Sequence, residues 1–194
     1  MPATLLPLEL PRAPDDASLL DRAKKGEEFA LDLLYRRHAP FVAAVALRLG
    51  RREADVEDIV QETFLLAFSR LDQLLHAGAL RGWLASIAVS FVHRRLRFSK
   101  WLRLFKTDAE AELTLSAMVS PAAGPELTAR IAELDEKVRA LPLHERTAWT
   151  MRFVLGCTLE ETAQACRCSL ATAKRRLAAA RAAVGTEVEV EVAP

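Results

Sequence analysis

Basic side chains gather between positions 174 and 181, at a spacing that would let them bind a nucleic acid. The group comprises Lys174, Arg175, Arg176 and Arg181. Guanidinium and ammonium groups hold backbone phosphates, and either group can also donate to a base edge in the major groove. The alternative is an ordinary helix whose basic face is solvated, so the residues around the group become important.

These surrounding residues follow the pattern of a helix-turn-helix. Thr158 and Glu161 have the spacing of a capping box, and Ser169 can cap a second helix after a turn at 167–168. Thr172 and Arg175 lie on the outer face of that second helix, so we predict that it reads duplex DNA. The predicted inner faces of the two helices consist of Leu159, Thr162, Ala163 and Cys166, then Leu170, Ala173, Leu177, Ala180 and Val184.

A helix predicted from about Ala54 to Leu71 has one face that mixes carboxylates with apolar side chains. That face carries Asp58, Gln61, Glu62, Leu65 and Phe68, whereas the core face carries Val56, Ile59, Val60, Thr63 and Ala67. An apolar centre with a charged rim suits docking to another protein. The alternative is a solvated face on which Leu65 and Phe68 are covered by neighbouring elements.

A further predicted helix, from about Arg81 to Ser99, places an aromatic ring near cationic groups. Its inner face would be formed by Leu84, Ile87, Ala88, Phe91 and Val92. The other face carries Ser86, Ser90, His93, Arg94 and Arg97, with Trp83 at its edge. Rings that stack on bases, next to cations that hold phosphates, favour binding of a single nucleic-acid strand.

These candidate sites need a helical scaffold, which the composition favours. The chain has 194 residues, 51% of them hydrophobic, and only seven glycines. The length allows two small domains with buried cores, and the abundance of Ala, Leu, Arg and Glu favours helices. The formal net charge is only +1. Acidic side chains nevertheless cluster at 53–62 and basic ones at 94–106, so separate surfaces could bind a protein and a nucleic acid.

Turn and helix signals predict an all-α protein of two small helical domains joined by a flexible linker, the second domain being the helix-turn-helix. We predict a disordered tail at 1–14, domains at 15–100 and 125–185, a linker at 101–124 and a second tail at 186–194, where glutamate and valine alternate. The other helices predicted in the first domain are one toward Lys25 capped by Asp16 or Ser18, one at 27–38 and one at 40–49.

Several classes of site are disfavoured by the residue pattern. Cys157, Cys166 and Cys168 are predicted to be structural thiols rather than a disulfide framework or metal ligands. The four histidines show no ligand spacing, and we find no catalytic triad, phosphate loop or paired carboxylates. We therefore expect no metal, no cofactor and no enzymatic activity. No signal peptide is evident and no apolar run reaches the roughly 20 residues of a membrane helix, so we expect a cytoplasmic protein without membrane insertion.

The motifs resemble those of the extracytoplasmic-function (ECF) subfamily of sigma-70 RNA polymerase sigma factors. Leu141-Pro-Leu-His-Glu-Arg-Thr-Ala-Trp, followed by Arg152-Phe-Val-Leu-Gly and the helix-turn-helix, resembles region 4 of that family, which reads the promoter −35 element. The resemblance implies −35 contacts by Ser169, Thr172, Lys174, Arg175, Arg176 and Arg181. Ala178 and Ala179 stand where family members often have larger side chains.

The helix around Asp58 resembles region 2.2 of the same family, and Phe29 to Pro40 resembles region 2.1. The resemblance implies that Asp58, Gln61, Glu62 and Leu65 bind core RNA polymerase at the β′ coiled coil, while region 4 meets the β flap. It also implies an anti-sigma partner. The −10 element would be recognised and melted through Trp83, Ser90, His93, Arg94 and Arg97, although Val89, Ser90 and His93 differ from the residues common in the family.

Two other classes of protein are weighed against a sigma factor. One is a helix-turn-helix activator or repressor that binds duplex DNA without polymerase, which the region 2 resemblance disfavours. The other is a helical enzyme with an accessory DNA-binding domain, which the missing catalytic residues disfavour.

Overall fold

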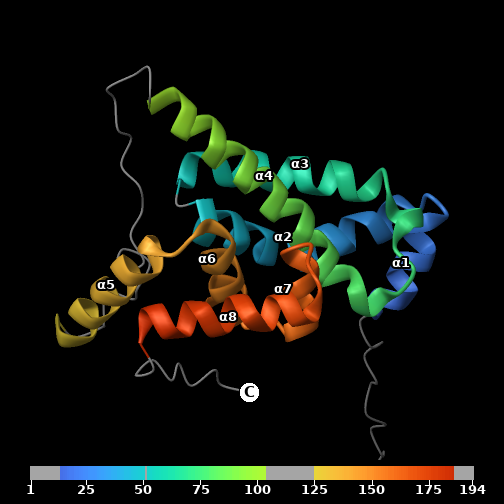
Figure 1. Ribbon diagram of the computed structural model, residues 1–194. Helices are drawn as coiled ribbons and strands as arrows, with labels where there is room; N and C mark the ends of the chain where they lie inside the picture. Colours follow the sequence, from blue (N-terminus) through green and yellow to red (C-terminus); the bar gives the residue numbers. More distant parts are fainter. Residues whose placement is uncertain (1–13, 51, 104–124, 186–194) are drawn as a thin grey trace, which may run out of the picture.

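A computed structural model describes residues 14–50, 52–103 and 125–185, and every regular element in these ranges is a helix (Figure 1). The predicted all-α class is confirmed. The tail expected at 1–14, apart from Pro14, most of the expected linker and the tail expected at 186–194 lie outside the described residues.

The first two helices differ from the sequence prediction. Helix α1 (Asp16–Lys24) is capped by Asp15, whose side chain accepts from Ser18 N at 2.9 Å, and not by the predicted Asp16 or Ser18. Helix α2 (Glu28–Gly50) runs through Pro40, where two helices were predicted. An internal proline costs about 3 kcal/mol in a helix. The helix continues because residues on both sides of Pro40 are buried in one core.

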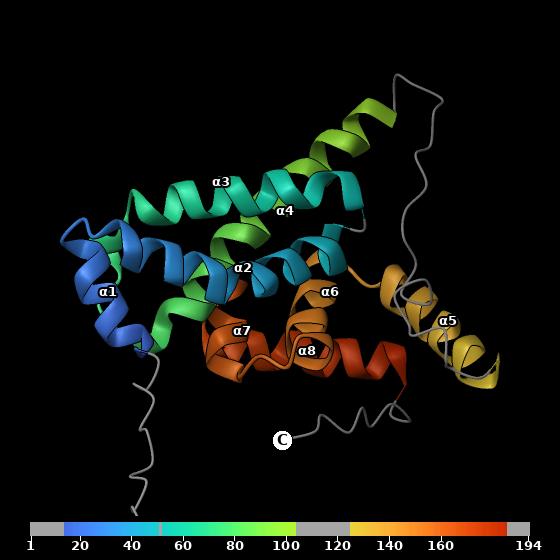
Figure 2. The same ribbon diagram turned by 180° about the vertical axis from the view of Figure 1, so that it is seen from behind.

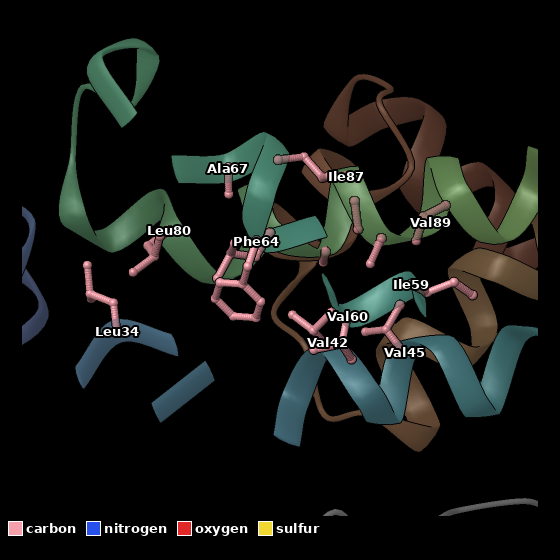
Figure 3. Close-up of a cluster of buried hydrophobic side chains, with 14 of the residues drawn as sticks. Leu34, Val42, Val45, Ile59, Val60, Phe64, Ala67, Leu80, Ile87 and Val89 are labelled. Carbon is pink, nitrogen blue, oxygen red and sulfur yellow. The ribbon is translucent and has the colours of Figure 1, made fainter. Parts of the chain in front are cut away.

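Helices α3 (Val56–Phe68) and α4 (Leu80–Arg103) complete the first unit, with short 3-10 turns η1 (Glu53–Asp55), η2 (Leu71–Gln73) and η3 (Ala77–Ala79). Helix α4 extends beyond the predicted end at Ser99. Figure 3 shows the core that these helices form with α2. Its labelled members are Leu34, Val42, Val45, Ile59, Val60, Phe64, Ala67, Leu80, Ile87 and Val89.

The second unit contains α5 (Pro125–Ala140), α6 (Leu143–Trp149), a π-helical turn η5 (Thr150–Val154), α7 (Leu159–Ala165) and α8 (Leu170–Val184). Helix α5 lies to one side and contacts α8 (Figure 1). The small core of this unit is formed by Val138, Leu141, Trp149, Ala180 and Val184.

The two units pack against each other, which the sequence did not predict. Helix α4 lies between α3 on one side and α7 on the other, in both views of the molecule (Figures 1 and 2). Met151, Cys157 and Ala165 of the second unit are buried in the same hydrophobic cluster as the first unit. This packing fixes the position of the candidate sites on the first unit relative to those on the second.

Candidate nucleic-acid and protein-binding surfaces

The helix-turn-helix is built by the local interactions that the sequence predicted. Both halves of the capping box form, since Thr158 Oγ1 accepts from Glu161 N at 3.1 Å and Thr158 N donates to Glu161 Oε2 at 2.8 Å. Ser169 caps α8 by accepting from Thr172 N at 3.2 Å. Arg167, in the turn, has a φ of 48°. A side chain at this φ is strained.

Helix α8 presents Lys174 and Arg175 to solvent, while Ala173, Leu177, Ala180 and Val184 are buried beneath it. Of the other predicted DNA contacts, Ser169 is exposed and Thr172 is half-buried, with their hydroxyl oxygens 2.9 Å apart. Leu170 was predicted on the inner face, but 38% of it is exposed. As the first residue of α8, it follows the turn directly and projects beyond the core.

Arg176 and Arg181, which were predicted to contact DNA, each interact with another side chain of the second unit. Arg176 is half-buried with its Nη1 atom out of solvent, and its guanidinium interacts with the thiol of Cys166. Arg181 is exposed, and its guanidinium carbon lies 4.9 Å from the centre of the Phe153 ring. Lys174 and Arg181 also border a groove of about 570 Å³ beside α8.

Helix α3 carries the candidate protein-docking surface. Asp58, Gln61 and Leu65 are exposed on one face, Glu62 is half-exposed, and Leu65 has 73% of its surface accessible. A large apolar side chain this exposed beside carboxylates suits an interface. Phe68, predicted on the same face, instead packs against the core, with its ring centre 5.5 Å from that of Phe64.

An ion-pair network that was not predicted from the sequence joins this surface to α4. Glu62 accepts from Arg94 at 2.6 Å and from Arg95 at 3.0 Å. Arg95 also lies 3.3 Å from Asp55 and 3.7 Å from Asp58. The acidic cluster at 53–62 and the basic cluster at 94–106 could have suggested these ion pairs. The two clusters can pair only because α3 and α4 lie side by side. The candidate docking residues and the candidate DNA residue Arg94 are thus in direct contact.

A groove of about 550 Å³ between α2 and the start of α3 lies next to the docking surface. Its apolar lining and charged rim consist of Tyr35, Ala39, Pro40, Ala43, Val56 and Val60, with Arg36, Glu53 and Glu57. From the sequence, Val56 and Val60 were expected on the core face of their helix, and no groove was predicted. The i, i+4 spacing of Tyr35, Ala39 and Ala43 on α2 could have indicated a second apolar face.

The candidate single-strand contacts on α4 do not share one open face. Arg94 and Arg97 are exposed, but Trp83, Ser90 and His93 are half-buried. His93 Nε2 lies 3.0 Å from Thr147 Oγ1 on α6. The second unit therefore covers part of the face that the sequence assigned to DNA.

The setting of His93 disfavours its charged form. Burial, together with the nearby charges of His144, Arg97 and Arg146, lowers the pKa of His93 to about 4. The ordinary pKa is 6.5. A folded-state pKa below the ordinary value means that this contact is fully stable above about pH 6.5 and weakens as the pH falls toward 4.

Arg81 and Gly82 of α4 make close polar and steric contacts with the second unit. The Arg81 guanidinium donates to Glu161 Oε2 at 2.8 Å and to Leu155 O at 3.1 Å, and it lies 4.1 Å from the centre of the Phe41 ring. At Gly82, an added Cβ would lie 3.3 Å from Glu161 Cα and would collide with the side chain of Gln164. The absence of a side chain at Gly82 thus permits the close approach of α4 and α7.

We expect Gly82→Leu to separate the two units, because the new side chain has no space against α7. The radius of gyration, measured by small-angle X-ray scattering, should rise while the helix content stays unchanged by circular dichroism. Gly78→Leu is the matched control, since an added Cβ there meets nothing within 4 Å. Equal scattering curves for both variants and the parent would contradict the observed contact as the state in solution.

The three cysteines are free thiols, and Cys157 is fully buried whereas Cys166 and Cys168 are half-buried. Burial raises the pKa of Cys157 and that of Cys166 to about 11. A thiol that stays protonated is a poor nucleophile and a poor metal ligand. Among the described residues, no group of three or more His, Cys, Asp or Glu side chains could hold a metal ion, and no helix is long and apolar enough to cross a membrane.

Comparisons with known proteins give a consistent result. Two family models match the chain, sigma-70 region 2 over residues 34–102 and sigma-70 region 4 over residues 131–184. The chain is 33% identical over 175 residues to the RNA polymerase sigma factor NccH of Alcaligenes xylosoxydans xylosoxydans, which covers 86% of this chain and 91% of the relative. It is 29% identical over 182 residues to the ECF RNA polymerase sigma-E factor of Salmonella typhimurium, with 90% and 94% covered.

The fold is also similar to a solved structure, that of the sigma factor RpoE in complex with the anti-sigma factor NepR from Bartonella quintana. The TM-score is 0.63 with 22% sequence identity, and the match covers 85% of this chain and 99% of the other. This likeness concerns the fold.

Proposed function

The chain belongs to the extracytoplasmic-function group of sigma-70 RNA polymerase sigma factors, and we propose from its geometry how it acts as a promoter-specific transcription initiation factor. It binds core RNA polymerase and directs it to promoters. The observation that supports this most directly is the presence, in one chain, of an exposed apolar and acidic face on α3 and a basic helix-turn-helix at α7 and α8. Residues 15–100 serve as region 2 and residues 125–185 as region 4, with 101–124 connecting them.

Polymerase docking is assigned to the α3 surface. Leu65 supplies the apolar centre, while Asp58, Gln61 and Glu62 supply polar contacts around it, and the partner is the β′ coiled coil. The apolar groove between α2 and α3 extends the same surface. Region 4 contacts the β flap, as the family resemblance implies. A helix-turn-helix regulator that acts without polymerase would not need a docking face that combines an apolar centre with a polar rim.

Recognition of the −35 element is assigned to α8, where Lys174 and Arg175 reach the major groove. Arg181 holds phosphate, and so does Arg176 once it turns from Cys166. Ser169 and Thr172 lie at the N-terminal end of α8, from which side chains of a recognition helix contact bases. Because Ala178 and Ala179 have side chains too short to reach the bases, recognition of the −35 element depends on the remaining residues of α8.

Recognition and melting of the −10 element is assigned to α4, through Trp83, Ser90, His93, Arg94 and Arg97. Since Ser90 and His93 border region 4, single-stranded DNA reaches them only after region 4 has moved away from α4. Polymerase binding supplies that movement, because a sigma factor that spans two promoter elements must hold its two DNA-binding regions apart.

The chain itself acts without catalysis, in the cytoplasm, where core polymerase is found. We also assign it an anti-sigma partner, which is supported by the complex of the structurally similar RpoE with NepR. Such a partner would restrain the chain by covering the polymerase-binding surface on α3.

The function is tested by run-off transcription with purified core polymerase on genomic fragments. We expect discrete promoter-dependent transcripts only when the chain is present, together with co-purification of the chain and core polymerase. Duplex DNA binding without either result would instead identify a regulator that acts independently of polymerase.

A further inference from the structure

A groove of about 570 Å³ runs along one side of α8, on the second unit. It is bordered by side chains from the successive turns of α8 and by residues from the preceding loop and helices. These are Lys174, Leu177, Ala178, Arg181, Ala182 and Gly185 of the α8 segment, with Arg152, Phe153 and Leu159.

The groove combines an apolar floor with a cationic rim. Phe153, Leu159 and Leu177 provide the apolar part. The cations are Arg181, which lies over the Phe153 ring, and Lys174, which is exposed. Arg152 adds a third, although one of its Nη atoms donates to Cys157 O at 2.8 Å. A ligand that fits this groove is anionic along one face and apolar along the other.

The segment that follows α8 has this chemistry. Residues 187–192 read Glu-Val-Glu-Val-Glu-Val, so an extended chain would place all the carboxylates on one face and all the valines on the other. Valine also favours the extended backbone.

The exit of the chain from α8 lies at the edge of the same groove. Gly185 lines the groove, its N–H donates to Arg181 O at 3.0 Å, and its φ is 95°. This left-handed φ is open to glycine and permits a sharp change of direction. The 11 residue steps from Lys174 to Gly185 span about 16 Å of helix, a distance that about five extended residues cover. Residues 186–192 can therefore reach the whole groove.

We propose that residues 186–192 dock in this groove as an extended segment that runs back along α8. The valines face Phe153 and Leu177, and the glutamates pair with Arg181, Lys174 and Arg152. Because the segment is tethered at the groove, its effective concentration is in the millimolar range, and weak contacts suffice to hold it. Insofar as Lys174 and Arg181 bind promoter DNA, which rests on the proposed function, the segment competes with DNA for region 4.

Docking is tested in the full chain by zero-length carbodiimide cross-linking, which joins an amine to a carboxylate in direct contact. We expect a cross-link from Lys174 to Glu189 or Glu191, identified by mass spectrometry of the digested chain. The matched control is Ala179→Lys, which places an amine on an exposed position of α8 outside the groove lining. Equal cross-linking at both positions, or none at Lys174, would overturn the proposal.

Competition with DNA is tested by the affinity for a duplex of random sequence at low salt. Val188→Ser, Val190→Ser and Val192→Ser together should raise this affinity severalfold, because the segment leaves the groove while every charge is kept. If the glutamates acted only through net charge, these serines would change nothing, and that result would overturn the competition.

Glu187→Gln, Glu189→Gln and Glu191→Gln should raise the duplex affinity about tenfold, which exceeds the effect of the same charge change at Glu28, Glu126 and Glu136. These three control positions are exposed on other helices. A cross-link at Lys174 without any change in duplex affinity would support docking of the segment and would contradict the assignment of α8 to DNA. Docking of residues 186–192 and DNA binding by α8 are thereby tested separately.

Discussion

Replacing Asp58 and Leu65 together, as Asp58→Ala with Leu65→Ser, should weaken binding of core RNA polymerase by about 100-fold. The two side chains are exposed on one face of α3, where Leu65 has 73% of its surface accessible. Buried apolar anchors and their charged neighbours supply most of the energy of such interfaces, at about 2 kcal/mol or more for an anchor. The measurement is the dissociation constant for core polymerase by fluorescence anisotropy of the labelled chain.

The choice of Asp58 and Leu65 follows from the structure. Glu62 would have been the other candidate from the sequence, but it pairs with Arg94 and Arg95 of α4. Its removal would disturb the candidate −10 helix as well as docking. Asp72→Asn, in an exposed turn of the same unit, is a control for the change of charge. An unchanged polymerase affinity, with duplex DNA binding reduced instead, would show that the α3 face has another role.

Replacing Lys174 and Arg175 together by alanine, as Lys174→Ala with Arg175→Ala, should lower the affinity for −35 promoter DNA by about 100-fold. Each base contact of this kind is worth about 1–3 kcal/mol, and removing one cation that binds phosphate reduces the slope of affinity against salt by about one. Both side chains are exposed on α8 while the residues beneath them are buried, so the fold should not change. Binding is measured on duplexes from promoters found by run-off transcription.

The control for this pair is Arg130→Ala, which removes a positive charge from the exposed part of α5 in the same unit. Polymerase affinity should be unchanged in the Lys174 and Arg175 variant. A loss of polymerase binding equal to the loss of DNA binding would contradict the assignment of separate surfaces to α3 and α8.

The ion pair between Glu62 and Arg94 connects the candidate docking surface to the candidate −10 helix. A carboxylate proposed to meet polymerase lies 2.6 Å from a guanidinium proposed to meet DNA. We expect that contact of polymerase with Glu62 releases Arg94 from this pair, so that Arg94 becomes available to phosphate. Docking and promoter binding are thus expected to be linked through α4, and the salt dependence of DNA binding should be steeper for the polymerase complex than for the free chain.

Local sequence determined most of the helices and the residue types on the candidate surfaces. The capping box of Thr158 and Glu161 and the cap by Ser169 depend on residues three positions apart, so they could be read directly. The core face of α3, with Ile59, Val60 and others, follows from the helical period. The exposed face with Asp58 and Leu65 follows from the same period. For these features, contacts within one or two helical turns carry the information.

Tertiary structure alone decided how these parts meet. Helix α2 continues through Pro40 because the burial of residues far apart in the chain offsets a local cost. The pairing of Arg81 with Glu161 joins residues 80 positions apart, and His93 is covered by a helix 54 positions away. No local period encodes such pairs. The sequence therefore specified the chemistry of each surface, and the packing of α4 between α3 and α7 determined which of those surfaces is open.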